Sequence, residues 1–110
     1  MTIQTSYAED VLTVRLTGEI DHHSAGGWRT AIDREAVCCH PRRLVLDFSD
    51  VSFMYSSGIG LVMGRYKLMR SWDGELRLTG LSRRLRQMMT LAGMDRLPVW
   101  EKGEKDEANE

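Results

Sequence analysis

Two adjacent hydroxyls, Ser56 and Ser57, stand in the stretch FMYSSGIG between an apolar run and two closely spaced glycines. A serine in such a place could act as a catalytic nucleophile or cap the first turn of a helix. Capping needs one hydroxyl and contributes about 1 kcal/mol, which leaves the second serine without a role. The pair therefore marks this stretch as the candidate functional site.

A catalytic serine finds no partners in this sequence. The G-x-S-x-G elbow of serine hydrolases is absent, and the histidines are His22, His23 and His40. Neighbouring histidines on a helix project in different directions and make a poor metal site. Cys38 and Cys39 are adjacent, so they supply too few ligands for a structural zinc site and are interpreted as buried or idle thiols. We therefore predict a protein that is not an enzyme and holds no metal.

The glycines allow another interpretation, because Gly58, Gly60 and Gly64 spell G-x-G-x-x-x-G after an apolar strand. This pattern resembles a dinucleotide-binding turn, in which backbone amides meet a pyrophosphate directly after the strand. Here roughly eight residues separate the strand from the glycines, and no G-K-[ST] follows for a phosphate loop. A small nucleotide-binding domain is kept as an alternative, and no cofactor is expected.

The serines must be positioned by the elements on either side, a short buried strand in RRLVLDFS and a helix that continues to about Arg70. At about 100° per residue, one apolar arc of this helix should face the sheet. That arc consists of Ile59, Val62, Met63, Tyr66 and Met69. The opposite strip consists of Gly60, Leu61, Gly64 and Leu68, where a helix that only covers a sheet would be polar. Either another helix of the same domain packs on this strip, or the strip receives a partner protein.

Strands and helices alternate along the rest of the chain. Two short strands joined by a turn at Glu9 and Asp10 indicate an opening hairpin, and a helix that includes Trp28 and Ile32 follows. ELRLTGL alternates as a further strand, and Ser82 is suited to cap a last helix. This order predicts an α/β fold in which helices cover a mixed sheet.

The composition suits a single domain, since the chain has 110 residues of which 42% are hydrophobic. We expect this domain to span 1–100 and the tail EKGEKDEANE at 101–110 to be disordered. A formal net charge of −1 gives no general attraction to nucleic acid or to a membrane surface. No apolar stretch reaches the ~20 residues that span a bilayer, and no basic segment precedes an apolar one at the start, so a cytoplasmic protein is predicted.

Three segments carry a resemblance to a known family: LTGEIDHHSA at 16–25, DFSDVSFMYSSGIGLVMGRYK at 47–67 and LTGLSRRLRQMMTLAGM at 78–94. They resemble the anti-anti-sigma factors of the STAS domain family, the sporulation members most of all. The resemblance implies a mixed sheet of about four to five strands with an opening hairpin, covered by about three to four helices. It also implies that Ser56 is phosphorylated by an anti-sigma factor that is itself a GHKL-type serine kinase. Unphosphorylated antagonist binds that kinase and frees a sigma factor, phosphorylated antagonist does not, and a PP2C-type phosphatase resets the cycle.

The resemblance also implies a partner surface made of the serine segment, the glycine strip and the GEIDHH turn. The residues concerned are Glu19, Asp21, Tyr55, Ser57, Gly58, Gly60, Leu61, Gly64 and Leu68. Taken alone, Glu19 and Asp21 would be a solvated charge and a helix cap. Tyr55 departs from the family, which usually has Asp before the phosphorylated serine, and this bears on phosphorylation and dephosphorylation more than on the fold. The alternative function within this fold is a STAS module of another partner-switching pathway.

Overall fold

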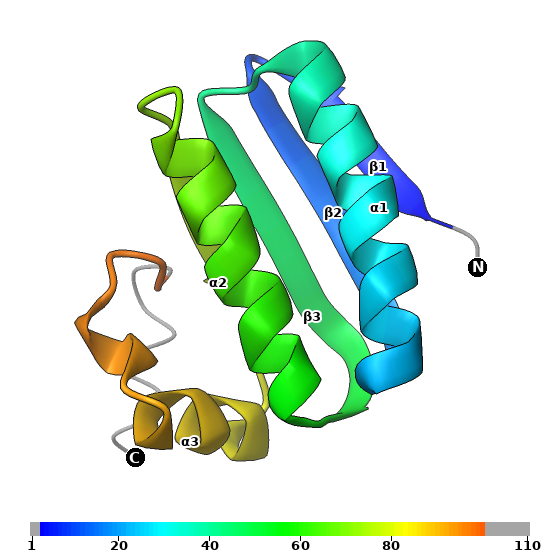
Figure 1. Cartoon of the computed structure of the whole chain (residues 1–110), viewed down its shortest axis with the longest axis vertical. Helices are drawn as coiled ribbons and strands as arrows, with labels where there is room; N and C mark the ends of the chain where they lie inside the picture. The colour runs from blue at the N-terminus through cyan, green and yellow to red at the C-terminus, as the bar shows by residue number, and fades with distance from the viewer. Residues whose placement is uncertain (1–2, 101–110) are drawn as a thin grey trace.

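A four-stranded sheet forms the centre of the computed structural model, which describes residues 3–100 (Figure 1). The strands are β1 (Gln4–Ala8), β2 (Val11–Ile20), β3 (Arg43–Met54) and β4 (Glu75–Thr79), and they lie in the order β1-β2-β3-β4. β1 runs antiparallel to β2, whereas β2, β3 and β4 are parallel. The predicted mixed sheet with an opening hairpin is confirmed. The tail predicted at 101–110 lies outside the described residues.

The opening hairpin turns through Glu9 and Asp10, which both have left-handed backbones with φ of 53° and 67°. Two consecutive left-handed residues make the kind of tight turn whose twist matches that of the flanking strands. In β2, Leu12, Val14 and Leu16 are at most 1% exposed, and the residues between them are not buried. The alternation of apolar and polar residues in the sequence therefore matches the alternation of buried and more exposed side chains in β2.

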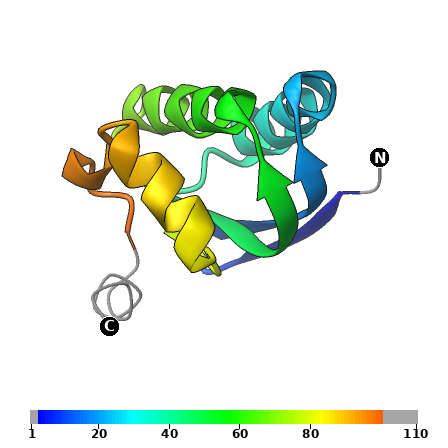
Figure 2. The same ribbon diagram turned by 90° about the horizontal axis from the view of Figure 1, so that it is seen from below.

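Three α-helices occur within residues 3–100: α1 (His22–Cys39), α2 (Ser56–Arg70) and α3 (Arg83–Leu91), followed by the single turn η1 (Met94–Arg96). α1 and α2 lie side by side on one face of the sheet, as Figure 2 shows. They bury Trp28, Ile32 and Met69 against it. At the β4 edge, Leu78 pairs with Trp100, so the segment after η1 covers that edge.

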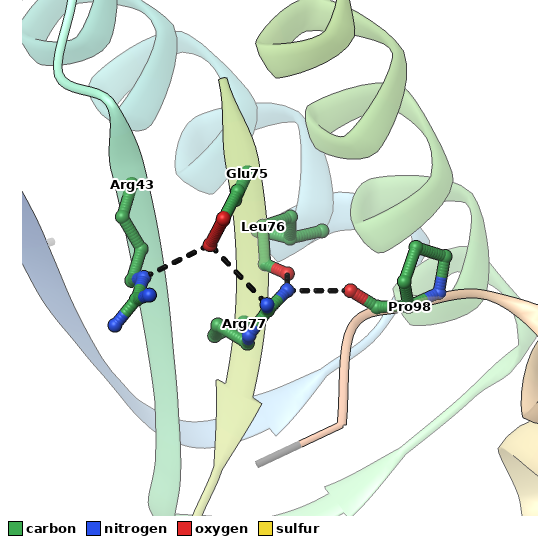
Figure 3. A network of polar contacts seen from close by, with 5 residues as sticks. All are labelled: Arg43, Glu75, Leu76, Arg77 and Pro98. Atoms are coloured by element: carbon green, nitrogen blue, oxygen red, sulfur yellow. Dashed lines mark hydrogen bonds and ion pairs between the residues drawn. The ribbon is translucent and has the colours of Figure 1, made fainter. Parts of the chain in front are cut away.

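The other face of the sheet is polar and carries ion pairs (Figure 3). Glu75 Oε2 lies 3.1 Å from Arg43 Nε and 3.2 Å from Arg77 Nη2. Arg77 Nη1 also donates to the Pro98 carbonyl at 2.6 Å, which ties the segment after η1 to β4. Because exposed ion pairs contribute only about 0–1 kcal/mol each, the core between sheet and helices holds the fold.

Candidate functional site

β2 and β3 bring the candidate residues together at the edge of the sheet where these two parallel strands end. Ile20, at the end of β2, pairs with Met54, at the end of β3, and the Tyr55 N–H donates to the Ile20 carbonyl at 2.9 Å. α1 begins at His22 and α2 at Ser56, each just after its strand. Both helices return across the same face, so their N-termini open side by side on this edge (Figure 1).

Ser56 is the first residue of α2 and is exposed to solvent. The N-cap is Tyr55, which has an extended backbone (φ −95°, ψ 178°) and a side chain that makes no capping hydrogen bond. Ser57 Oγ is buried and has no hydrogen-bond partner within residues 3–100. The interpretation of a serine as the helix cap is therefore wrong, because both serines already lie inside the helix.

Asp21 caps α1 at the same edge. Its Oδ1 accepts a hydrogen bond from the Ser24 N–H at 2.8 Å, and Ser24 Oγ accepts one from the Asp21 N–H at 2.9 Å. The Ser24 N–H is the main reason why the pKa of Asp21 lies below its ordinary value. Glu19 is exposed and pairs in register with Phe53, two residues before Tyr55. The structure thus brings both acidic residues beside the start of α2.

The buried side of α2 is rotated from the arc that the sequence predicts. Its buried residues are Gly58, Leu61, Val62, Arg65 and Met69. Leu61, predicted on the strip opposite the sheet, is only 4% exposed. Ile59, Met63 and Tyr66, predicted to face the sheet, are only partly buried. The assignment of Leu61 to an open surface is therefore wrong.

The rotated side of α2 makes a contact with α1. Arg65 Nε lies 2.8 Å from Asp33 Oδ1 of α1, so this side of α2 faces its neighbour. Leu61 and Leu68 stand one turn before and one turn after Arg65 on the same side, and Leu68 is partly buried against the core. Of the two interpretations left open by the sequence, packing against another helix of the same domain is the one that holds for these two leucines.

Gly60 and Gly64 remain open, because a Cβ added at either would meet no other described segment within 4 Å. Gly58 differs, since a Cβ there would collide with the Met54 side chain, and it serves the close packing of α2 on β3. The two open glycines share a side of α2 with its first serine. We call this side the outer face of α2: Ser56, Gly60, Met63, Gly64 and Lys67. Sequence reasoning missed Met63 and Lys67, although their helical spacing from Ser56 was a usable signal.

The remaining chemically active side chains do not gather into a site. Among residues 3–100, no group of three or more His, Cys, Asp or Glu side chains is placed to hold a metal ion. His40 lies at the far end of α1, with its ring centroid 4.3 Å from that of Trp72, and Cys38, two residues earlier in the chain, is exposed. In the same part of the chain, every helix is too short or too polar to cross a bilayer.

One protein-family model matches nearly the whole chain. A family model described as STAS domain matches residues 2–108. The chain belongs to the STAS domain family. This STAS domain is 30% identical over 100 residues to the anti-sigma F factor antagonist of Paenibacillus polymyxa, covering 90% of the chain and 86% of that protein. It is 34% identical over 86 residues to the anti-sigma-B factor antagonist of Bacillus subtilis (strain 168), covering 78% and 77%.

Solved structures show the same fold. The anti-sigma factor antagonist SpoIIAA in its unphosphorylated form matches with a TM-score of 0.78 and 26% identity, over 98% of this STAS domain and 95% of that chain. The Bacillus cell fate determinant SpoIIAA in the phosphorylated form matches with a TM-score of 0.69 and 26% identity, over 98% of each chain. The predicted fold of a STAS domain is thereby confirmed.

The missing cap of α2 gives a first testable prediction for this STAS domain. Tyr55→Asp should have a free energy of unfolding about 1 kcal/mol higher than Tyr55→Ala. The new carboxylate can accept the N–H of Ser57, as Asp21 accepts that of Ser24, because the Gly58 N–H already donates to the Tyr55 carbonyl at 2.9 Å. Alanine is the matched reference because both variants lose the edge contact between the Tyr55 and Phe53 rings, whose centroids are 4.8 Å apart.

The pH dependence of this gain has a definite sign. A capping carboxylate has a folded-state pKa below its unfolded value, so the gain is complete above about pH 4 and is lost as the pH falls through the folded-state pKa. Urea unfolding of both variants at pH 7 and at pH 2 measures the difference. Equal stability of the two variants at pH 7 would mean that α2 does not lack a side-chain cap.

Proposed function

We propose that this STAS domain is an anti-sigma factor antagonist that is controlled by phosphorylation of Ser56. The observation that carries the proposal is the exposed Ser56 on the first turn of α2, at one end of an outer face with two open glycines. The family and the names of the relatives support it. Unphosphorylated, the chain binds an anti-sigma factor and so frees a sigma factor; phosphorylated, it does not bind.

The physical basis of the switch is that a phosphate on Ser56 would leave α2 intact. Backbone amides and the helix dipole favour an anion at a helix N-terminus. The first turn of α2 holds no acidic residue, and no side-chain cap competes for its amides. The phosphate adds roughly −1.5 to −2 charge and three oxygens at the end of the outer face. Phosphorylation would therefore act on the binding surface rather than on the fold.

The proposed partners are an anti-sigma factor of the GHKL serine kinase type and a PP2C-type phosphatase that reverses its reaction. The outer face of α2 would supply the closely packed contact, and Glu19 and Asp21 a charged rim. Tyr55, which is 49% exposed, adds an apolar contact beside the serine. Gly58 and Leu61 are buried and would act through the packing of α2. Since the kinase consumes ATP, the cycle belongs in the cytoplasm.

A STAS module of another partner-switching pathway is the alternative function. The 34% sequence identity to an anti-sigma-B factor antagonist supports this alternative. A nucleotide-binding domain is less suited to the geometry. β3 runs on to Met54, closer to the glycines than the sequence indicates, but the Met54 side chain fills the space beside Gly58 where a pyrophosphate would approach the backbone.

The direct test is to mix the purified chain with an anti-sigma F factor and, separately, with an anti-sigma-B factor, and to measure affinity by calorimetry. We expect tight binding to one of them, with release of its sigma factor in a transcription assay. Added ATP should then place one phosphate on Ser56, located by mass spectrometry. Binding to neither protein, or a phosphate on Ser57, would overturn the proposal.

A further inference from the structure

Within residues 3–100, Arg65 is the only charged residue that is buried, with 6% of its surface exposed. Its Nε lies 2.8 Å from Asp33 Oδ1, but the N–H does not point at the oxygen, so the contact is an ion pair without a well-directed hydrogen bond. Arg65 Nη1 has no hydrogen-bond partner in the same part of the chain. Burial lowers the pKa of Arg65 against the attraction of Asp33.

A second positively charged residue lies near this ion pair and repels Arg65. Arg29 stands one turn before Asp33 on α1, and its charge also lowers the pKa of Arg65. Arg65 is thus attracted by Asp33 and repelled by Arg29. Burying a charge pair costs about as much as the attraction returns, and apolar replacements are often no less stable. Stability is therefore a poor explanation for this cluster.

The ion pair is suited to orienting α2. The apolar contacts of Leu61 and Leu68 tolerate small rotations and slides between the helices, whereas an ion pair with few alternative partners favours one arrangement. α2 is a continuous helix from Ser56 to Arg70. Ser56 and Arg65 are separated by roughly 14 Å along the axis, at about 1.5 Å per residue. A rotation at Arg65 would thus be transmitted to the phosphorylation site.

We propose that the Arg65–Asp33 ion pair positions Ser56 and the outer face of α2 for recognition by the anti-sigma factor. Both are positioning residues, since Arg65 is buried and acts through the helix. The inference rests on the function proposed above. The fixed orientation of the first turn of α2, however, can be measured in the free protein without a partner.

The test removes both charges together. Arg65→Met with Asp33→Asn keeps the aliphatic stem of the arginine and the shape of the acid. We expect a melting temperature close to that of the wild type, but anti-sigma factor binding weaker by about fivefold or more, the lower end of coupling between two sites. In the first turn of α2, hydrogen exchange of the Gly58 N–H, which donates to the Tyr55 carbonyl at 2.9 Å, should rise in the free protein. Arg43→Met with Glu75→Gln, an ion pair on the opposite face of the sheet (Figure 3), is the matched control and should change neither quantity.

A milder variant keeps the proposal testable if the double variant does not fold. Arg65→Lys retains the charge but loses the planar guanidinium, and we expect a smaller change in the same direction for both affinity and exchange. Wild-type affinity and wild-type exchange in the folded variant would overturn the proposal. If no anti-sigma factor binds even the wild-type chain, the proposed function fails, while exchange in the first turn of α2 still decides whether the ion pair fixes this helix.

Discussion

Phosphorylation of Ser56 is expected to weaken anti-sigma factor binding by more than about a hundredfold. At an effective dielectric near 20, an acidic partner group within ~5 Å would cost up to about 3 kcal/mol for each unit of phosphate charge. Exclusion of the added oxygens from a closely packed contact acts in the same direction. The melting temperature should not fall, because the anion lies at the N-terminus of α2, which has no side-chain cap.

Calorimetry with phosphorylated and unmodified chains against the same anti-sigma factor measures this effect. Ser57→Ala is the matched control: its hydroxyl is buried, so the variant should still be phosphorylated on Ser56 and should still switch. Ser56→Ala should bind constitutively. Ser56→Glu should bind more weakly than the wild type, though less so than the phosphorylated chain, since a carboxylate carries about half the charge of a phosphate. Equal affinities of the phosphorylated and unmodified chains would contradict the switch.

The sheet could be predicted from the sequence because its burial follows local patterns. Leu12, Val14 and Leu16 alternate with residues that are not buried, which is the period that a half-buried strand imposes. The turn at Glu9 and Asp10 needs only two residues that tolerate a left-handed backbone. Neither feature depends on distant parts of the chain.

The orientation of α2 could not be predicted, because it involves a contact with a distant residue. Helical periodicity assigns a charged residue such as Arg65 to the solvent side. In the fold, Asp33 of another helix holds Arg65 between α1 and α2, and the buried side of α2 turns so that Leu61 enters the core. Single-sequence patterns carry no information on such a partner, so the predicted strip contained two glycines that remain open and two leucines that do not.

The sequence places the candidate site at the start of α2, and the exact positions of its residues in that helix depend on the helix boundary. The prediction that a serine caps the helix placed the boundary one or two residues too late. With Tyr55 as the N-cap, Ser56 is in the first turn and exposed. This small shift matters for chemistry, because a capping hydroxyl is engaged with the backbone, whereas Ser56 is exposed, as the proposed phosphorylation requires.

Gly60→Leu should weaken anti-sigma factor binding by about 2 kcal/mol, or roughly thirtyfold, without loss of stability. Gly60 is exposed one turn from Ser56, and a Cβ there meets no other described segment within 4 Å. The leucine side chain therefore fits the free protein, and it also favours the helix by about 0.5–1 kcal/mol over glycine. In a complex it would occupy space that a closely approaching partner needs, since glycine is what permits such an approach.

Gly60→Ala separates the effect of bulk from that of helix propensity. It should raise the melting temperature, as leucine does, but should leave most of the affinity because it adds one methyl group. Thermal unfolding and calorimetry on both variants give the comparison, and Gly64→Leu extends it one turn further along the outer face. If Gly60→Leu binds as tightly as the wild type while phosphorylation of Ser56 still abolishes binding, the partner must dock on the edge at Glu19 and Asp21 and not along the outer face. The phosphate would then repel the partner from beside that edge rather than from within a packed contact.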